Sequence, residues 1–394
     1  MEQKTNRLHF IDAIRAWAIL MMLQGHFVDG LLDPAFRDPQ NGAYSLWLYF
    51  RGITAPVFFT VSGFIFTYLL IRVPQTGFEN PRIKKGLKRG LQLLLIGYLL
   101  RLNLFGLLQG KLYDTFFLVD VLHCIGISIM AIIAVYLLTA KLRKWALALA
   151  LSGISIVLFL FEPLYSSSTY SALPEGIANY FTRSNGSVFT VIPWVGYTAF
   201  GGFLAVLFRR YLSNKNLYST AIWLSLITGF SLVYFSSPFF SMLYELSGIS
   251  LFRDIVSNNY LFIRLGDVLI VFAVFMLIRK FLIQPTLLRL GQNTLSIYVI
   301  HFVILYGSFT GLGLYRFFHH SLSPAVAIGG ALAFMLVCAY AALKYDRHEL
   351  MIKGHIRSTI KSSKPFALRA YYSLSEFLII LQDRLLRLFN ITKG

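Results

Sequence analysis

The chain has 394 residues, of which 57% are hydrophobic and 13% are charged, and its mean hydropathy is +0.65. An ordinary soluble domain contains about 25% charged residues, so this composition excludes a soluble globular protein and indicates an integral membrane protein. The net charge of +19 does not indicate a nucleic-acid partner, because the basic residues are divided among alternate loops and form no single patch.

Apolar segments of about 20 residues, the length that crosses a hydrocarbon core, recur along the chain. They are continuously apolar, which predicts helices and not the alternating strands of a barrel. We expect an all-α, polytopic membrane protein, with a bundle of about ten transmembrane helices in residues 1–345. The expected spans are 14–32, 45–71, 87–109, 115–139, 144–162, 187–208, 219–240, 259–283, 292–314 and 323–344.

Residues 346–394 form a basic tail after the last span. Residues 366–389 mix apolar and charged side chains without an apolar run long enough to cross a membrane. We expect either an amphipathic helix on the cytoplasmic surface or a tail that packs against the bundle.

Positive charge alternates between the connecting loops. By the positive-inside rule, both termini and the even-numbered loops face the cytoplasm, as in a bacterial inner-membrane protein. The first apolar segment has no clear cleavage site, so we expect it to be retained as a span. The basic residues before span one and in the second loop are Lys4, Arg7, Arg72, Arg82, Lys84, Lys85, Lys88 and Arg89.

The first span carries three ionisable residues, Asp12, Arg15 and His26, although each is costly inside a membrane. His26 lies 11 residues after Arg15, or about 16 Å along a helix, and on nearly the same face. Arg15 and His26 therefore line one stripe. Asp12 and Arg15 could equally be an ion pair at the end of the helix.

Later spans carry further ionisable groups at a similar depth, toward the outer half of the bilayer. Each of them needs a partner, and one shared polar cavity between the helices is the simplest arrangement. These residues are Arg51, Asp120, His123, Arg264, Asp267 and His301.

Structural roles are open for the same residues. Asp120 and His123, three residues apart on one helical face, could be a hydrogen-bonded core pair or a base with its orienting carboxylate. Arg264 with Asp267 could be a structural ion pair, and His301 a packed hydrogen-bonding residue. Cys124 and Cys338 both fall inside predicted spans, which supports neither a disulfide framework nor a zinc cluster, and we expect no metal.

Five stretches resemble transmembrane acyltransferases. RLHFIDAIRAWAILMMLQGHF resembles the first helix of that superfamily, with its spaced Arg and His. FRGITAPVFFTVSGF, DVLHCIGISI and PWVGYTAFGGFLA resemble helices of the heparan-alpha-glucosaminide N-acetyltransferase-like branch. LGQNTLSIYVIH resembles a late helix shared with acyltransferase-3-like proteins. Ala16 departs from the glycine that the family usually has, and Trp17 beside it is also unusual.

The resemblance implies an enzyme that takes an acyl group, typically acetyl, from cytoplasmic acyl-CoA to a hydroxyl or amine, often of a sugar, at or across the membrane. His26 would be the base or acyl carrier, with Asp120 and His123 as further catalytic candidates. Acyl-CoA, a glycan or lipid-linked sugar and membrane lipids are the expected partners, and oligomerisation is open. The donor-binding candidates are Arg15, Asp12, Lys84 and Lys85, and the substrate-binding candidates are Arg51, His301, Arg264 and Asp267.

Two other functions fit a polar cavity between helices. A small-molecule transporter or lipid flippase uses such a cavity as a path, although the chain shows no inverted repeat. A membrane sensor would bind acyl-CoA without turnover. The long outer loops, about 162–186 and 241–258, are where we expect the acceptor to be selected.

Overall fold

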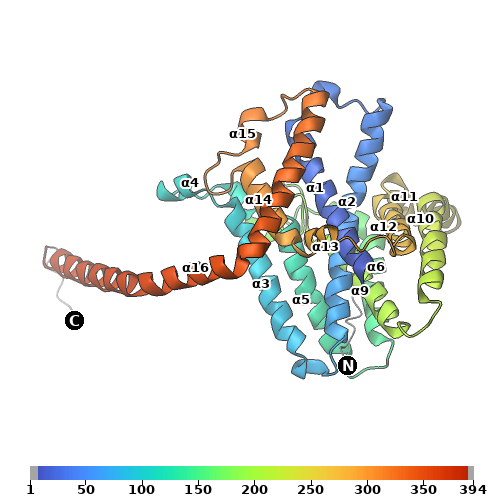
Figure 1. The fold of residues 1–394 in the computed structure, drawn as a ribbon, viewed down its shortest axis with the longest axis horizontal. Coiled ribbons are helices and arrows are strands. Elements are labelled where there is room, and N and C mark those ends of the chain that lie inside the picture. Colours follow the sequence, from blue (N-terminus) through green and yellow to red (C-terminus); the bar gives the residue numbers. More distant parts are fainter. Residues whose placement is uncertain (1–7, 389–394) are drawn as a thin grey trace. The chain divides into compact units, whose positions relative to one another are not determined.

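The computed structural model describes the backbone of residues 8–388 and, beyond His355, only some of the side chains. Within these residues the protein consists of helices and their connections, without a strand, which confirms the predicted all-α class (Figure 1). The helices are α1 His9–Leu31, α2 Gly42–Ile71, α3 Pro81–Arg101, α4 Leu104–Leu108, α5 Val121–Thr139, α6 Ala146–Leu160, α7 Glu162–Ser166, α8 Glu175–Ala178, α9 Val191–Arg210, α10 Leu217–Ser247, α11 Ser250–Ser257, α12 Tyr260–Leu277, α13 Pro285–Gln292, α14 Thr294–Tyr306, α15 Leu314–Phe318 and α16 Pro324–Leu388. Short 3-10 turns are η1 Pro34–Phe36, η2 Gly77–Glu79 and η3 Asp114–Phe117.

Six of the described helical segments are long and apolar enough to cross a membrane. A seventh arises if α13 and α14, which meet at an angle of 72°, form one bent span. This confirms an integral membrane protein with several spans. The six segments are Gly42–Ile71, Asp114–Thr139, Val191–Arg210, Leu217–Ser247, Tyr260–Leu277 and Pro324–His355.

Three further predicted spans are helical in the structure but are less suited to crossing a membrane. The first turns of α1 and α3 carry charged residues, and α6 has only 15 residues. A helix of that length is about 22 Å long, against a hydrocarbon core of about 30 Å. The count of ten spans and the orientation of the termini therefore stay predictions.

The chain divides into two compact units, Met1–Ala342 and Leu343–Gly394, with the boundary inside α16. In the second unit the backbone is helical as far as Leu388, and Lys353 forms an ion pair with Glu349. Most side chains of the predicted interfacial helix lie outside the described residues, as do the basic residues Lys4 and Arg7 of the topology argument. The surface location of the tail stays a prediction.

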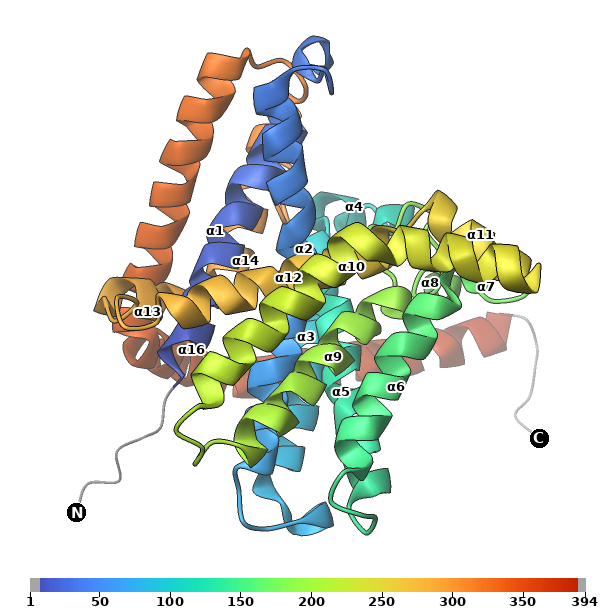
Figure 2. The same cartoon turned by 90° about the vertical axis from the view of Figure 1, so that its right-hand side faces the viewer.

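Glycines allow the backbones of α2 and α9 to touch. A Cβ atom at Gly63 would lie 1.9 Å from the backbone oxygen of Thr198, and one at Gly201 would lie 1.8 Å from that of Thr60. Small residues permit such close crossings between membrane helices. Helix α9 packs against both α2 and α6 (Figure 2), so these three helices form one closely packed group.

Helix α1 packs against α2, α12, α13 and α14 in the first unit. Its first turn enters an aromatic core where the ring of Phe10 contacts those of Phe64 and Phe208. Gly291 in α13 packs directly on the backbone of Asp12, where a Cβ would lie 1.8 Å from the carbonyl oxygen. These contacts fix the position of the helix that carries the first predicted site residues.

Candidate active site

His26 of α1 faces α14. Its Nδ1 atom lies 3.3 Å from Nε2 of His301 and 3.3 Å from the hydroxyl of Tyr306. The depth argument from the sequence placed His26 and His301 at one level, and the structure brings the two rings together. Tyr306, one turn further along α14, was not singled out from the sequence.

Arg15 contacts the start of α14. Its guanidinium donates a hydrogen bond of 3.0 Å to Thr294 and lies 3.7 Å from the carboxylate of Asp12. Because Arg15 meets Thr294 while His26 meets His301, α1 and α14 run in the same direction. Both ends of the predicted stripe on α1 are therefore matched by polar groups on one partner helix.

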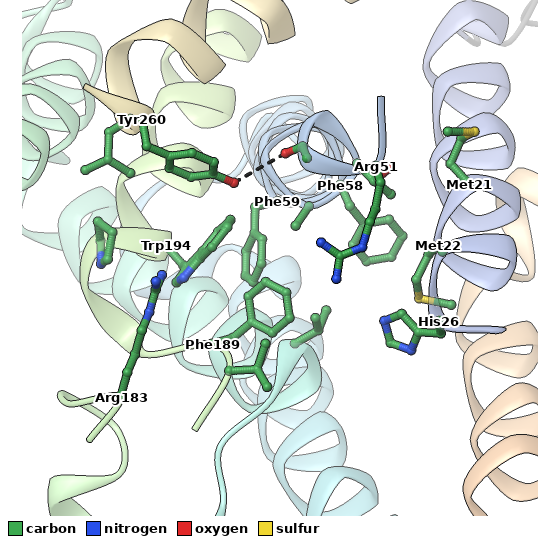
Figure 3. Close-up of a pocket in the computed structure, with 18 of the residues that line it drawn as sticks. Met21, Met22, His26, Arg51, Phe58, Phe59, Arg183, Phe189, Trp194 and Tyr260 are labelled. Atoms are coloured by element: carbon green, nitrogen blue, oxygen red, sulfur yellow. Dashed lines mark hydrogen bonds between the residues drawn. The ribbon is translucent and has the colours of Figure 1, made fainter. Parts of the chain in front are cut away.

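A cavity of ≈ 450 Å³ opens beside His26 (Figure 3). His26 and Met22 lie on one wall, Arg183 and Trp194 lie across from them, and the guanidinium of Arg51 projects between the two walls. Polar and aromatic groups thus surround a space large enough for a sugar ring, since small-molecule sites span about 300–1,000 Å³.

Arg51 is held at the cavity by the carboxylate of Asp29, to which its Nε donates. Asp29 lies in the last turn of α1, and its backbone oxygen accepts a hydrogen bond of 2.8 Å from Arg37. The pair fixes one guanidinium face while Arg51 still lines the cavity. Asp29 was missed in the sequence, although a carboxylate near the end of an apolar span is the same signal that identified Asp12.

Much of the cavity wall comes from residues that the sequence did not identify. Glu162 and Arg183 lie in or beside the first long outer loop, and Asn258 ends the second, so both loops expected to select the acceptor reach the cavity. Tyr260 donates to the backbone oxygen of Gly52 over 3.3 Å. The indole nitrogen of Trp194 is buried without a hydrogen-bond partner among the described residues, while the residue itself lines the cavity.

Asp120 and His123 form a closed pair at the start of α5. Asp120 is the N-cap residue and accepts from the backbone N–H of Leu122, while Nδ1 of His123 accepts from the backbone N–H of Asp120. Arg101 also contacts the Asp120 carboxylate, at 3.3 Å. Neither Asp120 nor His123 lines the cavity, and the His123 ring is fully buried.

Tyrosines enclose the His123 ring on its other side. The ring centroids of His123 and Tyr98 are 4.4 Å apart, and the Tyr98 and Tyr180 hydroxyls share a hydrogen bond of 2.6 Å. Burial and this hydrogen bond raise the pKa of Tyr180 well above its ordinary value, so its hydroxyl stays protonated. These contacts favour the core-pair interpretation of Asp120 and His123.

Arg264 and Asp267 form a pair on α12, with a separation of 2.9 Å. Asp267 also accepts a hydrogen bond of 2.6 Å from Tyr49, and Arg264 stacks over the Tyr49 ring. Asp267 lines a second, mostly apolar hollow of ≈ 350 Å³, which also includes Trp17. Arg264 and Asp267 are thus paired with each other and line no part of the cavity beside His26.

The remaining donor-binding candidates lie elsewhere in the first unit. Lys84 and Lys85 are exposed in the first turns of α3.

The two cysteines of the chain, Cys124 and Cys338, are buried as free thiols. Within the described residues, no group of three or more His, Cys, Asp or Glu side chains is arranged to hold a metal ion.

The fold and the cavity define a polytopic helical membrane protein with a histidine site between its helices. Residues 7–237, more than half of the chain, match the family described as heparan-alpha-glucosaminide N-acetyltransferase, catalytic. The chain belongs to this family, and membership implies transferase activity. No curated protein matches the chain.

The match supports one part of the resemblance seen in the sequence. It covers the segments that resemble the N-acetyltransferase branch. Residues 290–301, which carry the acyltransferase-3-like pattern and include His301, lie beyond the matched segment, so that part stays a prediction.

Proposed function

We propose that the chain is a membrane acyltransferase that moves an acyl group, in the simplest case acetyl, from cytoplasmic acyl-CoA to a hydroxyl or amine of a sugar-type acceptor. The observation that carries this proposal is the position of His26, which lines the cavity on one side and contacts His301 and Tyr306 on the other. A histidine held in this way can take a proton from an acceptor in the cavity.

The reaction needs one base and one group that stabilises negative charge. His26 takes the proton from the acceptor as the acceptor oxygen or nitrogen bonds to the acyl carbon. The carbon–sulfur bond breaks, and His26 returns the proton to the leaving thiolate. Arg51, which lines the same cavity, supplies positive charge for the developing oxyanion. A variant route passes the acyl group through His26 itself.

The donor is assigned to the Arg15 end of α1. Arg15 suits a phosphate of the coenzyme, with Asp12 orienting it, and Lys84 and Lys85 add positive charge on α3. The distance of about 16 Å along the helix to His26 suits an extended pantetheine arm. The proposal includes cytoplasmic entry of the donor and an inner-membrane location with both termini in the cytoplasm.

The acceptor is assigned to the cavity. Trp194 and Tyr260 offer aromatic faces of the kind on which sugar rings pack, and Arg51, Glu162 and Asn258 offer hydrogen-bonding groups. His301 contributes through its contact with His26. Arg264 and Asp267, predicted as substrate-binding, support this wall from behind, since Arg264 packs closely over Gly52.

The test is CoA release from acetyl-CoA by purified protein in lipid nanodiscs, with an envelope glycan extract as the source of acceptor. We expect acceptor-stimulated release that His26→Ala abolishes and His319→Ala, a change at an exposed histidine, leaves intact. Binding of acetyl-CoA without release in the unchanged protein would favour a sensor. Flux of the acceptor without chemical change would favour a transporter.

A further inference from the structure

The contacts of His26 raise a question of proton placement. In a neutral imidazole one ring nitrogen carries the proton and the other carries the lone pair. Nδ1 of His26 has two neighbours at 3.3 Å, Nε2 of His301 and the Tyr306 hydroxyl. Nε2 of His26 has no protein partner among the described residues, and the side chain lines the cavity. The tautomer at Nδ1 therefore decides whether Nε2 is a base or a donor.

The two neighbours favour opposite tautomers. His301 can accept a proton from Nδ1, which leaves a lone pair on Nε2 of His26. Tyr306 can donate its hydroxyl proton to Nδ1, which puts a proton on Nε2 and removes the base. The His301 ring is 0% exposed and packs at 4.8 Å from the ring centroid of Tyr298, so its position is fixed.

We propose that His301 is the positioning residue that holds His26 in the tautomer with an unprotonated Nε2. His26 Nδ1–H donates to His301 Nε2 before and during proton transfer, and this hydrogen bond stabilises the imidazolium that forms when Nε2 takes the acceptor proton. His301 thus performs the orienting task that a carboxylate performs in many histidine sites. The inference rests on the proposed function, in which His26 is the base.

Diethyl pyrocarbonate tests the tautomer without any substrate, because it reacts with an unprotonated imidazole nitrogen. Mass spectrometry of peptides from nanodisc protein gives the modification rate of each histidine. The modification rate at exposed His319 reports the effective reagent concentration and serves as an internal reference in every variant.

Four proteins give a predicted order of His26 reactivity. The unchanged protein reacts fastest, and His301→Gln, whose amide oxygen can accept from Nδ1, reacts nearly as fast. His301→Leu reacts at least about fivefold more slowly, because Tyr306 is then the remaining neighbour of Nδ1 among the described residues. Adding Tyr306→Phe to His301→Leu removes the competing donor and raises the rate again. Equal rates at His26 in His301→Leu and the unchanged protein would overturn the assignment.

Steady-state kinetics separate this inference from the proposed function. His301→Leu should lower kcat for CoA release by about 100-fold or more, leave KM for acetyl-CoA unchanged, and be largely rescued by Gln. A protein that keeps the reactivity order but releases no CoA would refute the acyltransferase proposal and leave the tautomer assignment intact. Normal kcat in His301→Leu would refute the positioning role.

Discussion

Two histidines of this protein look alike in sequence and differ in structure. His26 and His123 each lie within an apolar helix, at similar predicted depth, with aromatic neighbours and a polar partner. His26 lines a cavity, and within the part of the chain that the structure describes its partners contact Nδ1 and leave Nε2 without a hydrogen bond. His123 is fully buried, and its Nδ1 completes the cap of α5. The difference teaches that access to one free ring nitrogen, and not depth in the membrane, distinguishes the candidate catalyst.

The largest expected effect follows from removing the accessible histidine. His26→Gln keeps a polar side chain but cannot take up a proton, so we expect kcat for CoA release to fall at least about 1,000-fold. Thermal unfolding in nanodiscs should change little, because His26 is not part of a helix cap. A variant that keeps more than a tenth of the activity would exclude His26 as the base.

Changes to the buried pair of Asp120 and His123 should lower the stability of the protein instead of its activity. Asp120→Ala removes the cap of α5 and deprives Arg101 of its carboxylate partner, which should cost about 3 kcal/mol of unfolding free energy. Asp120→Asn is the matched control, since asparagine also caps helices and should lose less. Denaturant unfolding gives the unfolding free energy of both variants. Their kcat is measured in parallel and expressed per folded protein. A large loss of kcat at full stability would restore a catalytic role for Asp120 and His123.

A smaller effect is expected at the donor end of α1. Arg15→Ala should raise KM for acetyl-CoA about 10- to 100-fold, the value of one charge-assisted hydrogen bond, with a smaller change in kcat. Dephosphorylated analogues of the donor identify the group involved: if Arg15 binds a given phosphate, Arg15→Ala should not raise KM further for the analogue that lacks that phosphate. An unchanged KM would place the coenzyme elsewhere.

The smallest effect concerns the unpartnered indole of the cavity. Trp194→Phe keeps an aromatic ring at the cavity wall but offers a smaller stacking surface than the indole, so KM for the acceptor should rise about two- to tenfold while KM for acetyl-CoA stays constant. Trp194→Ala should raise KM for the acceptor further, because it removes the whole stacking surface. If both variants leave the acceptor KM unchanged, the acceptor does not occupy this wall.

The sequence predicted the parts of the structure that depend on local composition. Continuous apolar runs predicted the helices, and ionisable residues within them predicted Arg15, His26, Arg51 and His301 as members of polar contacts. The orientation predicted from charge placement stays a prediction, because the common direction of α1 and α14 does not show which side of the membrane their ends face.

Other features depend on tertiary packing and left no clear sequence signal. The bend of 72° between α13 and α14 brings Thr294 to Arg15, and although Gly291 lies two residues before the break, the sequence does not give the angle. Glu162 and Arg183 reach the cavity from the segment that connects α6 to α9. Tyr306 was missed because a tyrosine within an apolar helix is common and acquires its role only from the neighbouring His26.

The backbone contact between α2 and α9 has a consequence for how acceptor preference can change. Arg51 and Phe59 come from α2, and Trp194 comes from α9, so two walls of the cavity belong to helices that touch at Gly63 and Gly201. These helices cannot move closer, and any larger residue at either glycine would force them apart. Variation among related chains should therefore alter acceptor range through the side chains and the outer loops, while the distance between these two walls stays constant.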